Sequence, residues 1–466
     1  MRLRLLGALA ALSLLPLSGT TAVASEIGWL DCGDGLRCAG VTVPSDWASP
    51  KHSTPITVNL AKLPARDQTR KLGALLVNPG GPAAAIPGFR LSKASYAELT
   101  QWFDVVMFDP RGFGAGDGVS CPSPFPAAVD SPLERKAFTD YREANANFAR
   151  SCSPGMGPLV GKVNSWQVAR DMNAIRKALG ERKLRYYGNS YGTVFGQTYA
   201  ELFPHNVERM FLDSVLDHGE RRLFEWMAPM AATTERNLHR FAEWCAKAES
   251  CALYGKDALA VFDRVIAKAP VPAPGAGSGV TVSAGTIAAR VADQTAERRW
   301  PALATALAEA DAGDATALSR APQQPPDNSL ARTMLCADFP FDAGFVGHKA
   351  IEEQLRRTVA PRVGWADPVW GMTGHCDGLP KTGTHPPHPI RPVGLPPVLI
   401  TSGSNDTITP VEHGKRVAAQ LPGSRYLPAT GGHAVYRGGN PCVRRHVHRY
   451  LTTGELPAPG TSCPAV

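Results

Sequence analysis

Residues 184–196, LRYYGNSYGTVFG, place Ser190 between Gly188 and Gly192 in a G-x-S-x-G pattern. The residues before the pattern favour a short β-strand, and those after it are typical of a helix that ends at Pro204. Glycines on both sides of a serine suit a tight strand-to-helix turn, because side chains there would collide with the neighbouring strand or helix. The stretch therefore predicts such a turn with Ser190 at its tip. The pattern alone also fits an ordinary glycine-rich turn, since the chain holds 45 glycines among 466 residues.

The segments around this stretch alternate between strand and helix patterns. Apolar runs without alternation, at residues 72–77 and 103–108, stop at glycine turns, as strands buried on both faces of a parallel sheet do. Residues 165–179 carry one apolar helical stripe, with Ser165 as the expected N-cap and Gly180 as the stop. Period-two runs before residue 63 predict a hairpin of strands, and residues 209–213 predict a further strand. The chain is therefore expected to be an α/β protein with a mostly parallel sheet.

A serine in this position is a candidate nucleophile. The strained turn lifts the hydroxyl clear of the sheet and points the first N–H groups of the helix at whatever the serine attacks. Stabilising the negative charge that develops there requires two donors. We expect the backbone N–H of Tyr191 to be one donor and Gly81, in the turn after residues 72–77, to be the other. The alternative for Gly81 is a purely structural turn.

A hydroxyl nucleophile needs a base, and the base needs a carboxylate to orient it. On this kind of turn the partners follow in the order serine, acid, histidine. Asp406 comes after a predicted strand at residues 398–401, and His433 comes after another at residues 425–427. Each lies just past the carboxyl end of its strand, where open α/β sheets bind their ligands. Ser190, His433 and Asp406 are thus the candidate catalytic residues. Singly, Asp406 and His433 would be interpreted as ordinary loop residues.

The first 24 residues have the pattern of a secretory signal peptide. Two arginines precede an apolar run from Leu5 to Leu17, and residues 22–24, AVA, have the small-x-small arrangement of a cleavage site. The apolar run is shorter than the roughly 20 residues that a bilayer span requires. We therefore expect a secreted, extracellular protein without a membrane anchor after cleavage.

Ten cysteines agree with export, because disulfides persist in oxidising compartments. Pairing each cysteine with a neighbour in the sequence gives five bridges. The expected pairs are Cys32 with Cys38, Cys121 with Cys152, Cys245 with Cys251, Cys336 with Cys376, and Cys442 with Cys463.

Charge and histidine spacing argue against other classes of protein. The formal net charge of +8 is spread along the chain, and its densest basic run, residues 444–449, is expected to be a solvated helix face rather than a nucleic-acid site. His385 and His388 have a spacing that could hold a metal on a helix, but prolines on both sides forbid that helix. We expect no metal, no cofactor and no nucleic-acid partner.

Seven motifs occur together in an order that resembles one family. They are NPGGP, FDPRGFGAG, GNSYGT, RMFLDSVLDH, CADF, SGSNDTITP and GGHAVY. In this order behind a signal peptide, they resemble the secreted tripeptidyl aminopeptidases of actinobacteria, which are α/β-hydrolase serine peptidases related to prolyl aminopeptidases. Two positions depart from the family pattern. Residues 83–85 are alanines where the family continues with glycines, which predicts a bulkier pocket floor, and Gly116 stands where the family often has serine.

The resemblance implies an α/β-hydrolase core with an inserted, mainly helical cap. The expected divisions are a signal peptide at 1–24, core at 25–219, cap at 220–389, and core again at 390–466, with residues 384–397 as the return linker. The cap would exclude water and shape the pocket. Recognition of a protonated amine would need carboxylates, and Glu225, Glu235 and Asp338 are candidates, although a solvated surface role is expected for any single one.

The resemblance also implies an activity, with Ser190, Asp406 and His433 at the positions of the family's catalytic triad. The expected function is removal of short peptides, tripeptides in the family, from free N-termini through an acyl-enzyme. One alternative is an esterase or amidase acting on small secreted metabolites, since the same triad serves either bond. Another is a catalytically silent binding protein with a hydrolase fold.

Overall fold

The computed structural model describes residues 27–465, apart from 115–117, 120, 123–124, 127–133, 295, 320–328 and 367–375. The predicted signal peptide and Gly116 lie outside the described residues. None of the helices within these residues combines the length and the apolar character that crossing a membrane requires.

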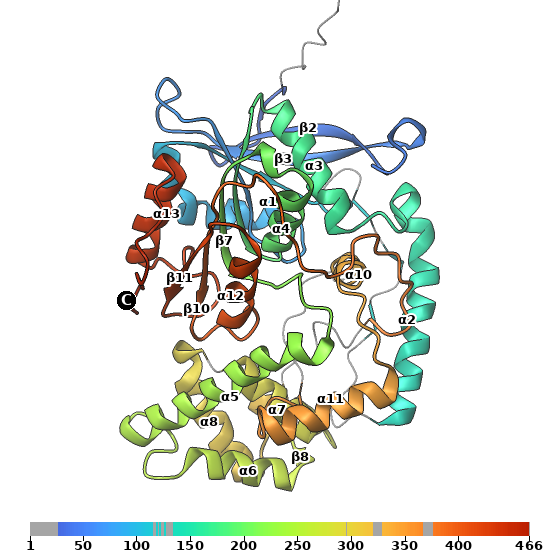
Figure 1. The fold of residues 1–466 in the computed structure, drawn as a ribbon. Helices are drawn as coiled ribbons and strands as arrows, with labels where there is room; N and C mark the ends of the chain where they lie inside the picture. Colours follow the sequence, from blue (N-terminus) through green and yellow to red (C-terminus); the bar gives the residue numbers. More distant parts are fainter. Residues whose placement is uncertain are drawn as a thin grey trace, which may run out of the picture.

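A nine-stranded sheet runs through the core (Figure 1). Its strand order is β1-β2-β3-β5-β4-β6-β7-β10-β11. The first four strands of this order, β1, β2, β3 and β5, pair antiparallel with one another. From β5 onward, through β4, β6, β7, β10 and β11, every pairing is parallel. The strands are β1 (Leu30–Asp31), β2 (Arg37–Pro44), β3 (Pro55–Leu63), β4 (Ala74–Asn78), β5 (Asp104–Phe108), β6 (Leu184–Ser190), β7 (Val207–Val215), β10 (Leu399–Gly403) and β11 (Arg425–Ala429). The predicted N-terminal hairpin is β2 and β3, and each predicted parallel strand is present.

Both faces of this sheet are buried, as the unbroken apolar runs predict. Val105 and Val106 are fully buried neighbours that contribute to different apolar clusters, one on each face. One cluster includes helices α1 and α13, and the other includes α2, α3, α4 and α12. These helices are α1 (Ala85–Ser92), α2 (Arg135–Met156), α3 (Ser165–Ala178), α4 (Gly192–Leu202), α12 (Val411–Gln420) and α13 (Pro441–Thr453). The mostly parallel α/β sheet of an α/β-hydrolase is confirmed.

The start of α3 corrects one prediction. The N-cap is Asn164, whose side chain accepts a hydrogen bond from the Gln167 N–H, and not Ser165. Ser165 is the first helical residue, and its hydroxyl and backbone N–H both donate to the carboxylate of Asp338. Gly180, with φ +74°, follows the end of the helix as expected.

Among the described residues, seven further α-helices follow β7 and precede β10 in the chain, and those labelled α5, α6, α7, α8 and α11 lie beyond one end of the sheet (Figure 1). Part of this region has an apolar cluster of its own, which buries Trp300, Leu303 and Leu307 on one helix. The expected bounds 220–389 of a cap domain stay a prediction. The elements are α5 (Leu223–Lys247), α6 (Ala258–Lys268), β8 (Val271–Pro272), β9 (Thr281–Val282), α7 (Ala284–Asp293), α8 (Trp300–Asp311), α9 (Thr316–Ser319), α10 (Ser329–Asp338) and α11 (Gly344–Thr358).

All five expected disulfides are present. Each closes a loop of 6 to 40 residues, and cysteines adjacent along the sequence are the ones that pair. The pairs are Cys32–Cys38, Cys121–Cys152, Cys245–Cys251, Cys336–Cys376 and Cys442–Cys463.

Candidate active site

Ser190 is the last residue of β6 and has φ +54°, a strained conformation for a residue with a side chain. The flanking glycines are required by space. A Cβ on Gly188 would lie 2.6 Å from the carbonyl oxygen of Gly192, and one on Gly192 would lie 2.4 Å from the carbonyl oxygen of Asn78. Helix α4 begins at Gly192. The predicted strand-to-helix turn is therefore confirmed, with the serine at its tip.

The glycine turn after β4 lies directly against this serine. A Cβ on Gly80 would lie 2.6 Å from Cβ of Ser190 and 2.8 Å from the backbone nitrogen of Tyr191. The N–H of Gly80 is used locally, because it donates to Oδ1 of Asn78 at 3.0 Å. In this turn, the N–H of Gly81 is therefore the candidate for the second oxyanion donor, together with the N–H of Tyr191. The oxyanion role of these two residues stays a prediction, which the packing of Gly80 supports.

His433 and Asp406 are brought together from two loops. Nδ1 of His433 donates to Oδ2 of Asp406 at 2.9 Å, and the carboxylate is almost fully buried. Oδ1 of Asp406 accepts the backbone N–H groups of Ile408 and Thr409, both at 3.0 Å, and the Thr409 hydroxyl donates to Oδ2. Because Nδ1 is a donor in this pair, neutral His433 has its Nε2 lone pair free to accept a proton.

Charge coupling within this pair sets its ionisation. Burial alone would lower the pKa of His433, but the adjacent Asp406 carboxylate outweighs burial and raises that pKa above its usual value. Burial likewise favours protonated Asp406, yet His433 and the hydrogen bonds from Thr409 lower its pKa. The geometry therefore holds an ionised carboxylate against an imidazole of raised basicity, as a general base requires.

The end of β7 anchors the loop that carries His433 next to the serine. Ser190 pairs with Val215 on β7. The hydroxyl of the preceding residue, Ser214, accepts the N–H of Ala434 at 2.8 Å. The histidine loop and the serine turn thus meet at the carboxyl edge of neighbouring strands. Direct contact between Ser190 and His433 stays a prediction, which this shared anchor supports.

Asp213, which the sequence patterns did not single out as a site residue, lies behind the same loop. Its Oδ2 accepts the backbone N–H of Tyr436 at 3.1 Å, and burial raises the pKa of Asp213 to about 6. Its charge also favours protonation of His433. The only signal in the sequence was the motif RMFLDSVLDH, which contains both Asp213 and Ser214.

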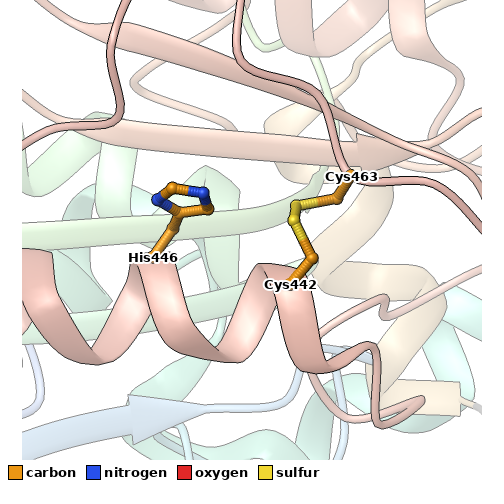
Figure 2. A group of neighbouring side chains, drawn as sticks. All are labelled: Cys442, His446 and Cys463. Carbon is orange, nitrogen blue, oxygen red and sulfur yellow. A yellow bond between two sulfur atoms is a disulfide. The ribbon is translucent and has the colours of Figure 1, made fainter.

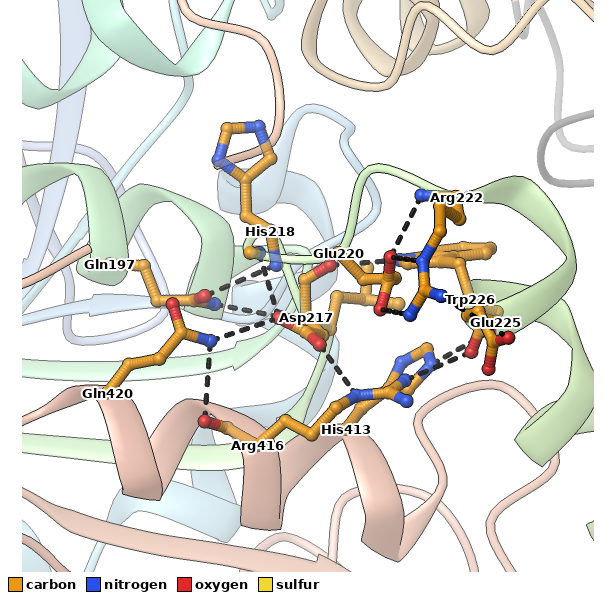
Figure 3. Close-up of polar contacts among 12 residues, drawn as sticks. Gln197, Asp217, His218, Glu220, Arg222, Glu225, Trp226, His413, Arg416 and Gln420 are labelled. Atoms are coloured by element: carbon orange, nitrogen blue, oxygen red, sulfur yellow. Dashed lines mark hydrogen bonds and ion pairs between the residues drawn. The ribbon is translucent and has the colours of Figure 1, made fainter. Parts of the chain in front are cut away.

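A polar network joins the start of α5 to α12, the helix that follows the Asp406 loop (Figure 3). Asp217 is buried, and its Oδ2 accepts Nε of Arg416 at 2.8 Å. Its backbone oxygen accepts Nε1 of Trp226 on α5, and the Trp226 backbone oxygen contacts Nε2 of His413 on α12 at 2.9 Å. Further along α5, Asn237 donates to the backbone oxygen of Asn405, next to the candidate acid. The helical region therefore packs directly on the candidate acid loop.

The three candidate amine-binding carboxylates have different surroundings. Glu225 is partly exposed beside Arg222, as expected for a surface residue. The expectation of a solvated role is wrong for the other two, which are buried. Oε2 of Glu235 accepts the backbone N–H groups of Arg362 and Val363, whereas Asp338 binds Ser165 and accepts the Tyr191 hydroxyl at 2.6 Å. Both buried carboxylates thus bind donors of the chain itself, because helix ends and loops need those acceptors.

Comparison with known proteins finds similarity to peptidases and to an esterase. Residues 363–463, which include Asp406 and His433, match the family described as TAP-like protein. Tripeptidyl aminopeptidase of Streptomyces lividans is 28% identical over 96% of this chain and 88% of that protein. Serine protease Hip1 of Mycobacterium tuberculosis (strain H37Rv) is 29% identical over 92% of this chain and 87% of that protein. Carboxylesterase B of the same strain is 29% identical over 96% of this chain and 91% of that protein.

Proposed function

Since the chain belongs to the tripeptidyl aminopeptidase and Hip1-like family of TAP-like α/β-hydrolases and is a serine hydrolase of that group, we propose that it is an exopeptidase. It removes short peptides, for which tripeptides are the first expectation, from substrates with a free N-terminus. The observation that supports this most is the hydrogen bond between the buried Asp406 carboxylate and the partly exposed His433, on loops at the same edge of the sheet as the strained turn that bears Ser190. Two of the relatives are named as peptidases, which favours peptide substrates.

The roles follow from the hydrogen bonds. Asp406 accepts from Nδ1 of His433 and so fixes the tautomer in which Nε2 takes the proton of the Ser190 hydroxyl. The serine oxygen attacks the scissile carbonyl, and the N–H groups of Tyr191 and Gly81 stabilise the oxyanion. His433 then gives the proton to the leaving amine, and water releases the acyl group by the same steps in reverse.

Export is part of the proposal. The signal-peptide pattern at residues 1–24 supports it, and so do five disulfides, which persist in oxidising surroundings. N-terminal sequencing of protein from the culture medium should find the chain starting near Ser25. Retention of the leader on cell-bound protein would contradict export.

The activity is tested with one defined peptide offered in two forms, with a free and with an acetylated N-terminus. Mass spectrometry of the products should show a short N-terminal fragment from the free form only. Ser190→Ala is the control, and it should fold normally and lose at least about 10³-fold in turnover. Equal cleavage of the acetylated peptide would argue against an aminopeptidase, and full activity of Ser190→Ala would remove the nucleophile assignment.

A second candidate, an esterase, is favoured by the similarity to carboxylesterase B. Short acyl esters and the free-N-terminus peptide are then compared by kcat/KM in the same preparation. A higher kcat/KM for the esters, with no peptide cleavage, would decide for the esterase. Failure of a fluorophosphonate probe to label Ser190 would instead indicate a silent hydrolase fold.

A further inference from the structure

Glu201, His385 and His388 converge at the edge of the core, away from the residues assigned to catalysis. Glu201 lies on α4, and both histidines lie on the non-helical segment that returns from the helical region to β10. Nε2 of His385 is 3.1 Å from Oε2 of Glu201, and Nε2 of His388 is 2.9 Å from Oε1. One ligand atom from each residue falls within 4.8 Å of the other two. The histidines need no helix, because the carboxylate comes from a distant part of the chain.

The hydrogen bonds of His388 determine which lone pair faces the carboxylate. Its Nδ1 lies 2.7 Å from the carbonyl oxygen of Pro386, so Nδ1 must be the donor. In the neutral ring Nε2 then carries a lone pair, and this lone pair points at an oxygen of Glu201. Two lone pairs repel unless a proton or a metal ion lies between them. A donor bond from one ring nitrogen to a carbonyl is also how metal-binding histidines are usually oriented.

Two atoms of the trio are buried without a hydrogen-bond partner. They are Nε2 of His385 and Oε2 of Glu201, which face each other at 3.1 Å but form no hydrogen bond. Buried nitrogen and oxygen atoms of this kind carry an energetic cost unless something satisfies them. A cation shared by both would satisfy them, as well as the facing pair at His388.

We propose that Glu201, His385 and His388 bind a divalent metal ion of the zinc class. Two imidazoles and one carboxylate are a donor set that Zn²⁺ accepts, with water able to complete the coordination. The ion would join the return segment to α4, the helix that starts at the nucleophile turn. The backbone N–H of His388 already donates to the carbonyl oxygen of His218, so the segment is held at this place from a second side.

A second trio in the chain supplies a matched control. The ligand atoms of Cys442, His446 and Cys463 also lie close enough together to share an ion, but the two cysteines are joined in a disulfide (Figure 2). A disulfide sulfur is not the thiolate that binds zinc. Replacement of His446 should therefore leave metal binding unchanged.

The test uses the mature chain without a polyhistidine tag, stripped with EDTA and dialysed against Zn²⁺ at pH 7.5. Elemental analysis should find one zinc per chain, and the melting temperature should rise with Zn²⁺ and return with EDTA. Glu201→Gln and His385→Ala should each weaken Zn²⁺ binding by more than about 100-fold. Loss of a residue that only hydrogen-bonds to a metal ligand already lowers the affinity by about 10- to 100-fold, and these two residues would be ligands themselves. His446→Ala should bind as the parent chain does.

A parallel measurement keeps the proposal testable if a variant fails to fold. Co²⁺ added to the parent chain should give visible absorption bands of a nitrogen- and oxygen-ligated ion, and Zn²⁺ should displace them. Zinc below one equivalent in the parent chain, no Co²⁺ bands, or undiminished binding in Glu201→Gln would each overturn the site and leave the trio as an ion pair. None of these measurements depends on peptide cleavage, so they are independent of the proposed function.

Discussion

At the scale of single residues, the ionisation of His433 should control the rate. The raised pKa of His433 means that acid inactivation begins above the ordinary histidine value of about 6.5, because a protonated imidazole cannot accept the serine proton. The rate kcat/KM should fall as pH falls through that raised pKa. In Asp406→Asn the carboxylate that raises it is gone, so the acid limb should move to lower pH while kcat drops steeply.

Initial rates with a fluorogenic peptide from about pH 5 to 9 measure both effects. Glu225→Gln, a partly exposed carboxylate on α5, is the control and should leave the midpoint unchanged. An identical midpoint in Asp406→Asn would show that another group carries the titration.

Tyr191 allows its backbone and side chain to be separated. The hydroxyl binds the buried Asp338 at 2.6 Å, whereas the expected oxyanion donor is the main-chain N–H. Tyr191→Phe should therefore lose about 1–3 kcal/mol of unfolding free energy and keep most of its kcat. The loss should shrink below about pH 6, because burial raises the pKa of Asp338 to about 6 and a protonated carboxyl group needs the donor less. Urea unfolding at two pH values, combined with kinetics, measures this, and a collapse of kcat at normal stability would assign the hydroxyl itself to catalysis.

At the scale of elements, the glycine turn after β4 and the serine turn act as one unit. An added methyl on Gly80 would approach Cβ of Ser190 to 2.6 Å, and its φ of +96° already disfavours any side chain. Gly80→Ala should therefore lower kcat by at least about 10²-fold, comparable to loss of one oxyanion donor. Gly88→Ala is the matched control, because nothing lies within 4 Å of the added atom on α1. Unchanged kcat in Gly80→Ala would mean that this turn plays no part in the site.

Elements fixed by local chemistry were predictable from the sequence. The turn at Ser190 and the buried strands followed from glycine spacing and apolar runs. The choice of Asp406 and His433 came from the chain order that such a serine turn requires, and the structure brings these two side chains together. The start of α3 was not predictable, because a carboxylate 173 residues away engages Ser165 and leaves the cap to Asn164. The cluster of Glu201 with His385 and His388 was not predicted for the same reason, because Glu201 and His388 are 187 residues apart in the sequence. Pairings of that range depend on the tertiary fold, which local patterns do not encode.

At the scale of the whole molecule, one buried ion pair ties three segments together. Arg111, in the turn after β5, donates to both oxygens of Asp171 on α3 and to the backbone oxygen of Ser45 after β2. Both charged side chains are essentially inaccessible. Asp171→Asn would leave the guanidinium buried without its charge partner and should cost about 3–5 kcal/mol of unfolding free energy.

Thermal and urea unfolding measure that loss. Asp140→Asn, which breaks the exposed pair with Lys136 on α2, is the control and should have little effect. Equal stability of the two variants would contradict a structural role for the buried pair.

The placement of the disulfides has a consequence for how this fold can diversify. Three bridges lie within residues 25–219 or 390–466, and two, Cys245–Cys251 and Cys336–Cys376, lie within residues 220–389. None joins one group to the other, so the helical segment can be exchanged for that of a relative without orphaning a thiol. Recombination could thus replace the segment 220–389 as a unit while every remaining cysteine keeps its partner.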